Sequence, residues 1–183
     1  MRAIRLCGTS ALIAIALLCL TGTALAEDIS GFITTTRTIR DNSRLVGDVT
    51  CTVTGAPCIT FGASHIDLRL NGFTITGQAD PTTACNGTTT ANEHGISSGG
   101  QSDVEVRGPG VVQRFRAHGI FFTGTLLGKF FTGTLLGKVE EVTTTTNCMS
   151  GILINPTSSK ISIGSNVSVR NGSMQPGAPC GGI

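Results

Sequence analysis

The chain has 183 residues, with 13 lysines and arginines, 11 aspartates and glutamates, and a formal net charge of +2. Two of the basic residues, Arg2 and Arg5, lie at the start, so the remainder is neutral overall and lacks the basic surface that nucleic-acid binding requires. Tryptophan and tyrosine are absent, and glycine is frequent at 25 residues. Isolated valine and isoleucine between threonine, serine and asparagine are typical of short strands and turns, which predicts an all-β chain.

Residues 1–26 have the features of a secretory signal peptide. A basic start precedes the apolar run SALIAIALLCL, and Ala24-Leu25-Ala26 provides a small-x-small cleavage site. The apolar run is shorter than the roughly 20 residues that a transmembrane helix needs, and no later stretch is long enough to span a bilayer. We therefore expect cleavage after Ala26, a secreted or periplasmic location, and no membrane span after cleavage.

The rest of the chain is predicted to form one domain, because its length suits a single domain and no stretch resembles an interdomain linker. Residues 27–44 are predicted to be an N-terminal cap or lead-in segment, and residues 45–183 the main domain. Within this domain, a cysteine-bearing excursion is expected at 78–93 and a duplicated insertion within 121–138.

Five cysteines follow the predicted cleavage site. In an exported protein they are expected to form disulfides, and the odd number leaves at least one thiol free or paired with another chain. Cys51 and Cys58 flank the turn-rich stretch TVTGAP, which is short enough to bring them together. A Cys51–Cys58 disulfide is therefore predicted, whereas the pairing of Cys85, Cys148 and Cys180 is left open.

A long repeat underlies the sequence. His94-Gly95-Ile96 recurs 24 residues later as His118-Gly119-Ile120, and Gly151-Ile152 follows after a further 32 residues. The second interval contains the nine-residue string FFTGTLLGK twice in succession. Without one copy this interval is 23 residues, close to the first. The doubled string is therefore predicted to interrupt the longer period, with one copy continuing the strand after Ile120 and the other leaving it as a loop or hairpin.

A second alignment supports this period. Residues 64–72, SHIDLRLNG, align with residues 102–110, SDVEVRGPG, and more faintly with residues 159–166, SKISIGSN. Each segment alternates apolar and polar residues over a short run bounded by glycine or asparagine, which is the pattern of a short half-buried strand. Strands this short cannot bury a face alone, so the repeat predicts a solenoid in which each coil stacks on the next.

The chain resembles the right-handed parallel β-helix proteins of the pectin-lyase-like superfamily. The resemblance rests on the repeated Gly-Ile, on IDLRLNGFTITG at 66–77 and on VSVRNG at 167–172, and it covers roughly residues 45–173. It implies a right-handed parallel β-helix of about four or five short rungs. The superfamily includes lyases, hydrolases, epimerases, phage tailspikes, adhesins and accessory proteins of copper handling. An antiparallel sandwich is the structural alternative, because many short strands with regular turns also pack that way.

Asp67 and Glu105 occupy equivalent positions of the two best-aligned segments, as do Arg69 and Arg107. On adjacent rungs, the two acids would project outward close enough to share a hard cation such as calcium. The resemblance implies a lyase-like site, with calcium held by the acids and an arginine acting as base. The preferred interpretation is a solvated ladder of offsetting charges, because nothing nearby would depress an arginine pKa enough for base catalysis.

His94 and His118 each precede Gly-Ile, so the coil is predicted to stack them. Two imidazoles form only a weak copper or zinc site without a third ligand, and His65 aligns with Asp103 instead of with them. Histidines on the rim of the coil without a metal are therefore the preferred interpretation.

For function, these features favour an exported non-catalytic β-helix module that presents an extended surface to a glycan or protein partner. A polysaccharide lyase or glycoside hydrolase using the acidic and arginine face is the first alternative, and a periplasmic metal-handling accessory protein is the second. The lack of tryptophan and tyrosine argues against an aromatic sugar-binding groove. No polar cap precedes the final Gly-Gly-Ile, so self-association through an uncapped end is also considered.

Overall fold

The computed structural model describes residues 26–79, 92–127, 130–133 and 135–172, and all regular structure in them is β-strand. The predicted signal peptide and most of the predicted excursion at 78–93 lie outside the described residues. The strands in chain order are β1 (Glu27–Ile33), β2 (Arg37–Ile39), β3 (Ser43–Cys51), β4 (Ile59–Phe61), β5 (Ile66–Arg69), β6 (Thr74–Thr76), β7 (Ile96–Ser97), β8 (Val104–Gln113), β9 (Ile120–Phe122), β10 (Gly124–Leu127), β11 (Phe130–Gly133), β12 (Leu135–Thr145), β13 (Ile152–Ile154), β14 (Ser159–Gly164) and β15 (Val167–Val169).

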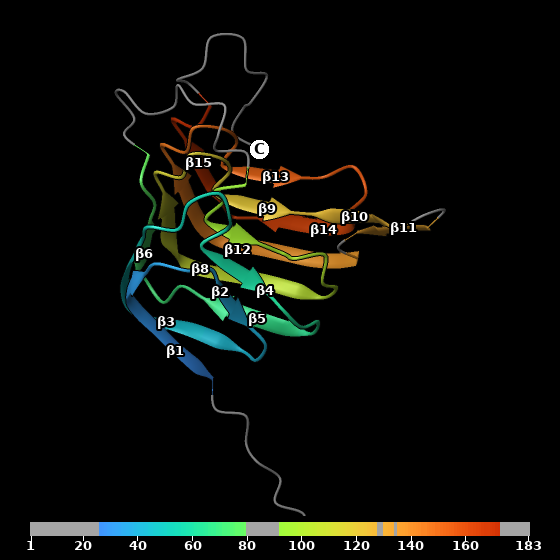
Figure 1. Cartoon of the computed structure of the whole chain (residues 1–183), viewed down its shortest axis with the longest axis horizontal. Helices are drawn as coiled ribbons and strands as arrows, with labels where there is room; N and C mark the ends of the chain where they lie inside the picture. The colour runs from blue at the N-terminus through green and yellow to red at the C-terminus, as the bar shows by residue number, and fades with distance from the viewer. Residues whose placement is uncertain (1–25, 80–91, 128–129, 134, 173–183) are drawn as a thin grey trace, which may run out of the picture.

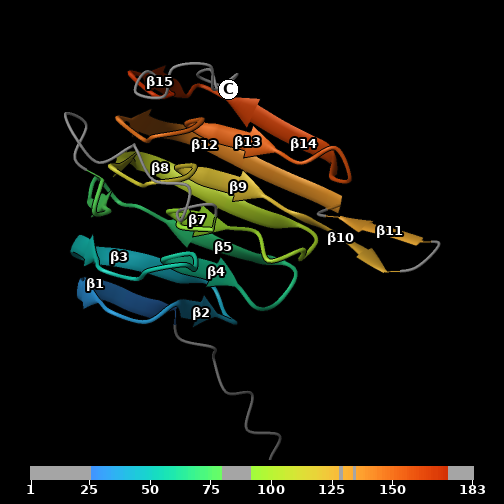
Figure 2. The ribbon, with the colours of Figure 1, turned by 45° about the horizontal axis from the view of Figure 1, so that its top comes forward.

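Two parallel sheets run along the stack of strands (Figures 1 and 2). The larger has the order β1-β3-β5-β8-β12-β14, with β6 and β15 paired alongside, and the smaller has the order β13-β9-β7-β4-β2. The chain passes from one sheet to the other, and each strand pairs in parallel with its equivalent in the next repeat, which we call the next rung. The predicted all-β, parallel architecture is confirmed, and the antiparallel sandwich is wrong.

The larger sheet bends, so the stack has three faces. Strand β3 pairs with β5 through Ser43 and Arg44, and with β6 through Val49 and Thr50. The pairing between β8 and β12 shifts register between Glu140 and Val142, at the level of the bend, and continues on both sides of the shift. The first face contains β5, β14 and the beginnings of β3, β8 and β12, and the second face contains β6, β15 and the ends of β3, β8 and β12. The smaller sheet forms the third face.

The register of the third face matches the intervals found in the sequence. Ile96 lies opposite Ile120, and Ile120 lies opposite Ile152. With Ile59, which pairs with Ile96, they form an inward column in which each side chain is at most 1% exposed. Burial of one such side chain contributes about 1.5–3 kcal/mol, so these columns are the main source of stability of the narrow core.

The register of the first face matches the second alignment. Asp67 lies opposite Glu105 and Arg69 opposite Arg107. The rung between this pair of segments and β14 is supplied by Gly137–Glu140, which pairs with β8 on one side and with β14 on the other. Sequence comparison missed this copy because glycine replaces its first apolar residue and because it begins within the doubled string.

Glycine recurs before isoleucine because the rungs approach too closely there for a side chain. A Cβ atom on Gly95 would lie 2.6 Å from the carbonyl oxygen of Gly119, and a Cβ atom on Gly119 would lie 2.6 Å from that of Gly151. The Gly119 N–H group donates to the Ser150 carbonyl at 3.1 Å. The repeated Gly-Ile is therefore a requirement of rung spacing on the third face.

Residues in the left-handed region recur at the corners, where the chain leaves one face for the next. Residues other than glycine occupy these positions, although each non-glycine residue in the left-handed region lowers the stability by an amount of order 1 kcal/mol. At the start of the first face they are His65 and Asp103, directly before β5 and β8, and Leu136 and Lys160, the second residues of β12 and β14, with φ of 63°, 54°, 62° and 56°. Those that follow the strands of the second face are Arg114, Thr146 and Arg170, with φ of 59°, 52° and 55°.

The doubled string forms part of the coil and a hairpin. Strands β10 and β11 pair in antiparallel fashion, with Gly124 opposite Gly133, and the hairpin projects from the stack between β9 and β12 (Figure 2). Each copy contributes to both, because Phe121 and Phe122 lie in β9 whereas the end of the second copy begins β12. We had expected one whole copy to leave the coil. Removing any nine consecutive residues that begin between 121 and 130 leaves the same sequence, so the sequence does not define which nine residues are the insertion. The corner after β9 determines where the extra residues leave the coil.

Residues 27–44, which we predicted to be a cap or lead-in segment, contain β1, β2 and the beginning of β3. Strand β1 pairs with β3, and β2 pairs with β4, both in parallel. This segment therefore continues the two sheets.

The predicted disulfide between Cys51 and Cys58 is confirmed, with Cα atoms 6.0 Å apart across a sequence separation of 7. Cys148 is also disulfide-bonded. The predictions for Cys85 and Cys180 lie outside the described residues.

A methyl group at Gly119 should destabilise the fold. In Gly119→Ala the new Cβ would collide with the backbone of the next rung, so we expect the free energy of unfolding to fall by about 1–3 kcal/mol. Gly164→Ala is the matched control, because a Cβ there meets no atom within 4 Å. Urea unfolding monitored by circular dichroism measures both, and equal stability of the two variants would contradict the close approach at Gly119.

Deleting residues 125–133 should leave the coil intact. The variant retains one complete copy of FFTGTLLGK between Ile120 and Val139. Because loop length affects closure entropy only weakly, we expect the free energy of unfolding to change by less than about 1 kcal/mol. Circular dichroism and thermal unfolding check this, and loss of the folded state would show that the hairpin supports the coil.

Candidate functional site

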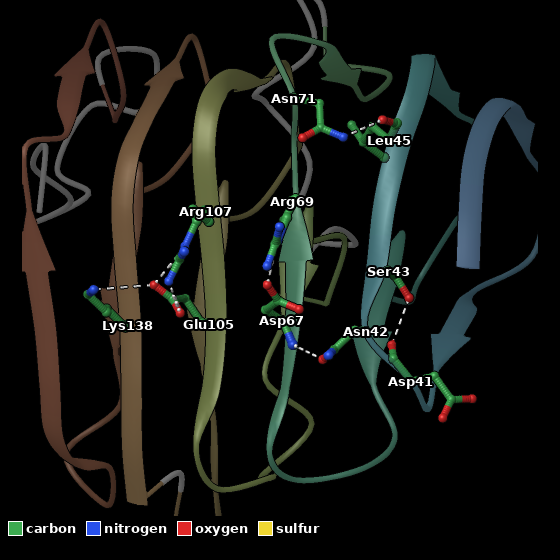
Figure 3. Close-up of polar contacts among 10 residues, drawn as sticks. All are labelled: Asp41, Asn42, Ser43, Leu45, Asp67, Arg69, Asn71, Glu105, Arg107 and Lys138. Atoms are coloured by element: carbon green, nitrogen blue, oxygen red, sulfur yellow. Dashed lines mark hydrogen bonds and ion pairs between the residues drawn. The ribbon is translucent and has the colours of Figure 1, made fainter. Parts of the chain in front are cut away.

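The outward side chains of the first face form two columns, which we call the ladder. Figure 3 shows part of it, with Asn42, Asp67, Glu105 and Lys138 of one column and Arg69 and Arg107 of the other. The strand register places the members of each column on successive rungs, about 4.8 Å apart. One column contains Asn42, Asp67, Glu105, Lys138 and Ser162, and the other contains Asp28, Arg44, Arg69, Arg107 and Glu140.

Each charged residue of the ladder pairs with an opposite charge. Arg69 Nε donates to Asp67 Oδ2 at 2.8 Å, and Arg107 Nη2 donates to Glu105 Oε2 at 2.8 Å. Lys138 Nζ lies 2.6 Å from Glu140 Oε2 and 3.4 Å from Glu105 Oε1. The four acids are Asp28, Asp67, Glu105 and Glu140, and the four bases are Arg44, Arg69, Arg107 and Lys138. The charges of the ladder therefore sum to zero.

The guanidinium groups form the outer layer of these pairs. The Arg69 side chain is 55% exposed and that of Asp67 is 15% exposed, and the Arg107 side chain is 43% exposed against 20% for Glu105. Solvent or a ligand therefore meets arginine N–H groups first, with carboxylate oxygens beneath them.

The ion pairs hold the ladder in its charged form. The hydrogen bond from Arg107 to Glu105, together with the charge of Glu105, raises the pKa of Arg107 above its ordinary value. Hydrogen bonding to Glu140 likewise raises the pKa of Lys138, and the hydrogen bond from Arg44 lowers the pKa of Asp28. Arg107 is therefore a poor general base, because base catalysis would need the opposite shift.

Two adjacent hollows lie along the ladder, with volumes of about 230 Å³ and about 210 Å³. Asn42, Asp67 and Arg69 line both. The first also has His65, Ile66, Asp103 and Glu105 in its wall, and the second has Ala26, Ser43 and Arg44. The two hollows therefore share part of their lining. Carboxylates are more frequent in the first hollow, and arginines are more frequent in the second.

Amide side chains fix the geometry beside these hollows (Figure 3). The Asp67 N–H group donates to Asn42 Oδ1 at 3.0 Å, and Asn71 Nδ2 donates to the Leu45 carbonyl at 3.0 Å, so both amides link consecutive rungs. Ser43 Oγ donates to the Asp41 carbonyl at 2.8 Å. Asn42 was missed from sequence because the strand that follows it, β3, was not aligned with the repeats.

The sequence analysis also missed Asp28, Arg44, Lys138 and Glu140 of the ladder. Arg44 Nε donates to Asp28 Oδ1 at 2.6 Å, across a sequence separation of 16 instead of 24. Lys138 and Glu140 lie on the rung that begins in the doubled string. These residues could have been found by searching the sequence for alternating charged residues without requiring a fixed interval between the repeats.

His94 and His118 are buried, and both rings contact Phe121, whereas the sequence predicts histidines on the rim of the coil. They are 4% and 6% exposed, and their rings stack with centroids 5.3 Å apart at an interplanar angle of 15°. Phe121 covers the pair, with its ring centroid 4.4 Å from that of His94. The Ser150 N–H group donates to His118 Nδ1 at 3.1 Å, and the His118 N–H group donates to His94 Nδ1 at 3.4 Å. Each Nδ1 atom is therefore occupied by the backbone.

Burial keeps the two imidazoles neutral. Desolvation, with a smaller contribution from the charge of His118, lowers the pKa of His94 to about 3. Desolvation lowers the pKa of His118 to about 4. At neutral pH both rings act as hydrogen-bond acceptors that extend the backbone pairing between rungs.

The four metal candidates fall in two separate places, with Asp67 and Glu105 on the ladder and His94 and His118 buried beside Phe121. His65 Nδ1 lies 2.8 Å from Asp103 Oδ2, which is the pairing that the alignment predicts. Within the part of the chain that the structure describes, no group of three or more histidine, cysteine, aspartate or glutamate residues is arranged to hold a metal ion. Catalytic and metal-binding roles for these residues stay predictions.

No family model, no curated protein and no solved structure matches the chain. Among residues 26–79, 92–127, 130–133 and 135–172, no helix has the length and apolar character needed to cross a membrane. Function must therefore be inferred from the ladder and its hollows.

Acid should destabilise the protein through the buried histidines. An unfolded histidine takes up its proton near pH 6.5, whereas the folded rings do so only near pH 4 and pH 3. The unfolded state therefore binds more protons in this window. The contribution of the neutral histidines to the free energy of unfolding is fully present above about pH 6.5. It decreases as the pH falls towards 4, by at most about 1.4 kcal/mol per pH unit for each histidine.

Urea unfolding between pH 7 and pH 4.5 measures this dependence. Replacing both rings, His94→Asn with His118→Asn, leaves an oxygen near each Nδ1 position but removes the titrating groups. We expect the pH dependence to become shallower. An unchanged slope in this variant would assign the acid sensitivity to other groups.

Proposed function

We propose that the protein is an exported, non-catalytic right-handed parallel β-helix, similar to pectin-lyase-like proteins, that binds a glycan along its ladder. The observation that carries the proposal is the combination of four acids and four bases, all in ion pairs, beside two hollows that share Asn42, Asp67 and Arg69. Export is inferred from the signal-like residues 1–26 and is consistent with the disulfide between Cys51 and Cys58.

A hydroxyl-rich ligand fits this surface better than a charged polymer. Sugar hydroxyls both donate and accept hydrogen bonds, and each ion pair of the ladder presents both kinds of partner. Arg69 uses Nε to bind Asp67, which leaves the other guanidinium N–H groups for a ligand. Because the charges sum to zero, the ladder offers no net attraction to a polyanion or a polycation.

A binding role is favoured over catalysis because the acids and bases of the ladder are already committed to each other. Asp67 is paired with Arg69, and Glu105 with Arg107 and Lys138, so neither carboxylate is poised as a lone acid or base. The raised pKa of Arg107 works against the arginine base that a lyase would need. Lyase or hydrolase activity remains the alternative that the experiment must distinguish.

The test is affinity electrophoresis of the purified protein in gels that contain neutral or uronate-containing polysaccharides. Binding to at least one neutral glycan is expected, with little dependence on salt. In the double variant Asp67→Ala with Arg69→Ala, which preserves net charge, affinity should fall at least about tenfold, since two to three hydrogen bonds to charged groups are lost. Arg40→Gln, which alters an exposed arginine outside the ladder, should bind as the wild type does.

Two outcomes would overturn the proposal. The first is the absence of binding to every glycan, or equal binding by the wild type and the double variant. The second is release of unsaturated product from uronate polysaccharides, followed by absorbance, which would make the protein a lyase.

A further inference from the structure

The first rung of the coil lies at the end of both parallel sheets. Strand β1 is the terminal strand of the larger sheet, and β2 is the terminal strand of the smaller one. Within the part of the chain that the structure describes, the outer edges of β1 and β2 therefore pair with no other strand. An open edge presents N–H and C=O groups that can pair with another chain, so a second copy could stack at this end.

Two charged residues, Glu27 and Arg37, occupy inward positions of this rung. The column of Glu27 continues through Ser43, Leu68, Val106, Val139 and Ile163, and the column of Arg37 continues through Ile59, Ile96, Ile120 and Ile152. The alternation along each strand agrees with this register, because Ile29 and Ile39, two residues further on, are 5% and 0% exposed. The charges therefore stand where the later rungs carry serine or an apolar residue.

An ion pair joins these two residues across the end of the core. Arg37 Nη2 donates to Glu27 Oε1, so the contact links β2 of the smaller sheet to β1 of the larger one. The Arg37 and Glu27 side chains are 51% and 27% exposed. The apolar inward residues of the same rung, Ile29, Ile33 and Ile39, are at most 8% exposed. Solvent at this end therefore meets the ion pair much more than the isoleucines.

The stability of a single chain does not account for these charges. An exposed ion pair contributes little to the free energy of unfolding, whereas an apolar side chain packed on the core contributes more. Such a side chain at position 37 would lie next to Ile59, which is fully buried. The main effect of the charges is instead on a second copy of the chain.

A second copy could not stack on this rung without removing the charges from water. In a continuous stack the neighbouring rung would be the last rung of that copy, and the columns would bring Glu27 against its Ile163 and Arg37 against its Ile152. Isoleucine cannot replace the hydrogen bonds to water, and the attraction within a buried ion pair often fails to offset the cost of desolvation. Stacking of two first rungs on each other would bury both ion pairs at the same kind of cost.

We propose that the Glu27–Arg37 ion pair is a cap that keeps a second copy of the chain from stacking on the first rung. Inward-pointing charge on a terminal strand is a known means of blocking edge-to-edge pairing. The cap is separate from the proposed glycan site, because neither Glu27 nor Arg37 lines either hollow. Residues 27–44 therefore continue the two sheets and also close the coil at this end.

The test is sedimentation velocity of the purified exported protein over a range of concentrations. The variant Glu27→Leu with Arg37→Leu preserves net charge and makes both inward positions apolar. We expect its weight-average mass at high concentration to be at least about twofold that of the wild type, because each rung-to-rung contact adds a whole copy. Mass spectrometry checks that cleavage follows Ala26 in each variant, since residue 27 adjoins the predicted site.

Two control variants separate inward charge from other effects. Asp28→Leu with Arg44→Leu removes an ion pair at outward positions of β1 and β3, and it should associate no more than the wild type. Glu27→Arg with Arg37→Glu reverses the capping pair but keeps both charges inward, so it should also behave as the wild type does. Glycan affinity of the leucine variant at Glu27 and Arg37, measured at low concentration, should match that of the wild type.

Equal association of the wild type and this leucine variant would overturn the proposal, as would an equal gain in the Asp28 and Arg44 control. Loss of the folded state in the leucine variant, seen by circular dichroism, would also overturn it, because the pair would then be needed by the coil itself. Failure of glycan binding leaves the association measurements unchanged, so the failures of the two proposals are distinguishable.

Discussion

Backbone hydrogen bonding between consecutive rungs is the constraint on which the rest of the structure depends. Most strands have only three or four residues on a given face, so their N–H and C=O groups find partners only one rung away. Every rung must therefore repeat the same path, and residues at equivalent positions form columns. Gly95 and Gly119, the inward isoleucines and the stacked histidines are all consequences of this repetition, because each position meets the same surroundings as its equivalent.

Columns also concentrate chemistry on the surface. A residue type that suits one rung recurs a few ångströms away, which turns single side chains into arrays. The bend in the larger sheet then separates two arrays that share the same strands. On one side of the bend, Arg69 and Arg107 lie over carboxylates, and on the other side Thr76 and Thr145 lie among uncharged neighbours. The same long strands β3, β8 and β12 therefore carry two outward surfaces of different composition.

Much of the fold could be predicted from sequence because the repeat is written in it. His94 and His118, which are 24 residues apart, are neighbours in space, and so are Asp67 and Glu105, which the alignment pairs. The burial of the histidines could not be predicted, since the interval fixes which residues stack and not the side to which they point. The complete ladder also escaped prediction, because Lys138 is the last residue of the second copy of FFTGTLLGK and no sequence signal distinguishes it from Lys129, the last residue of the first copy.

The hairpin of β10 and β11 has a consequence for how such a protein can change. It leaves the stack at a corner where β9 and β12 keep their own partners, so the coil is indifferent to what lies between them. We therefore expect insertions at this corner to have little effect on the free energy of unfolding. The same corner is accordingly a natural graft site, where a foreign peptide with neighbouring ends can be displayed on a rigid scaffold.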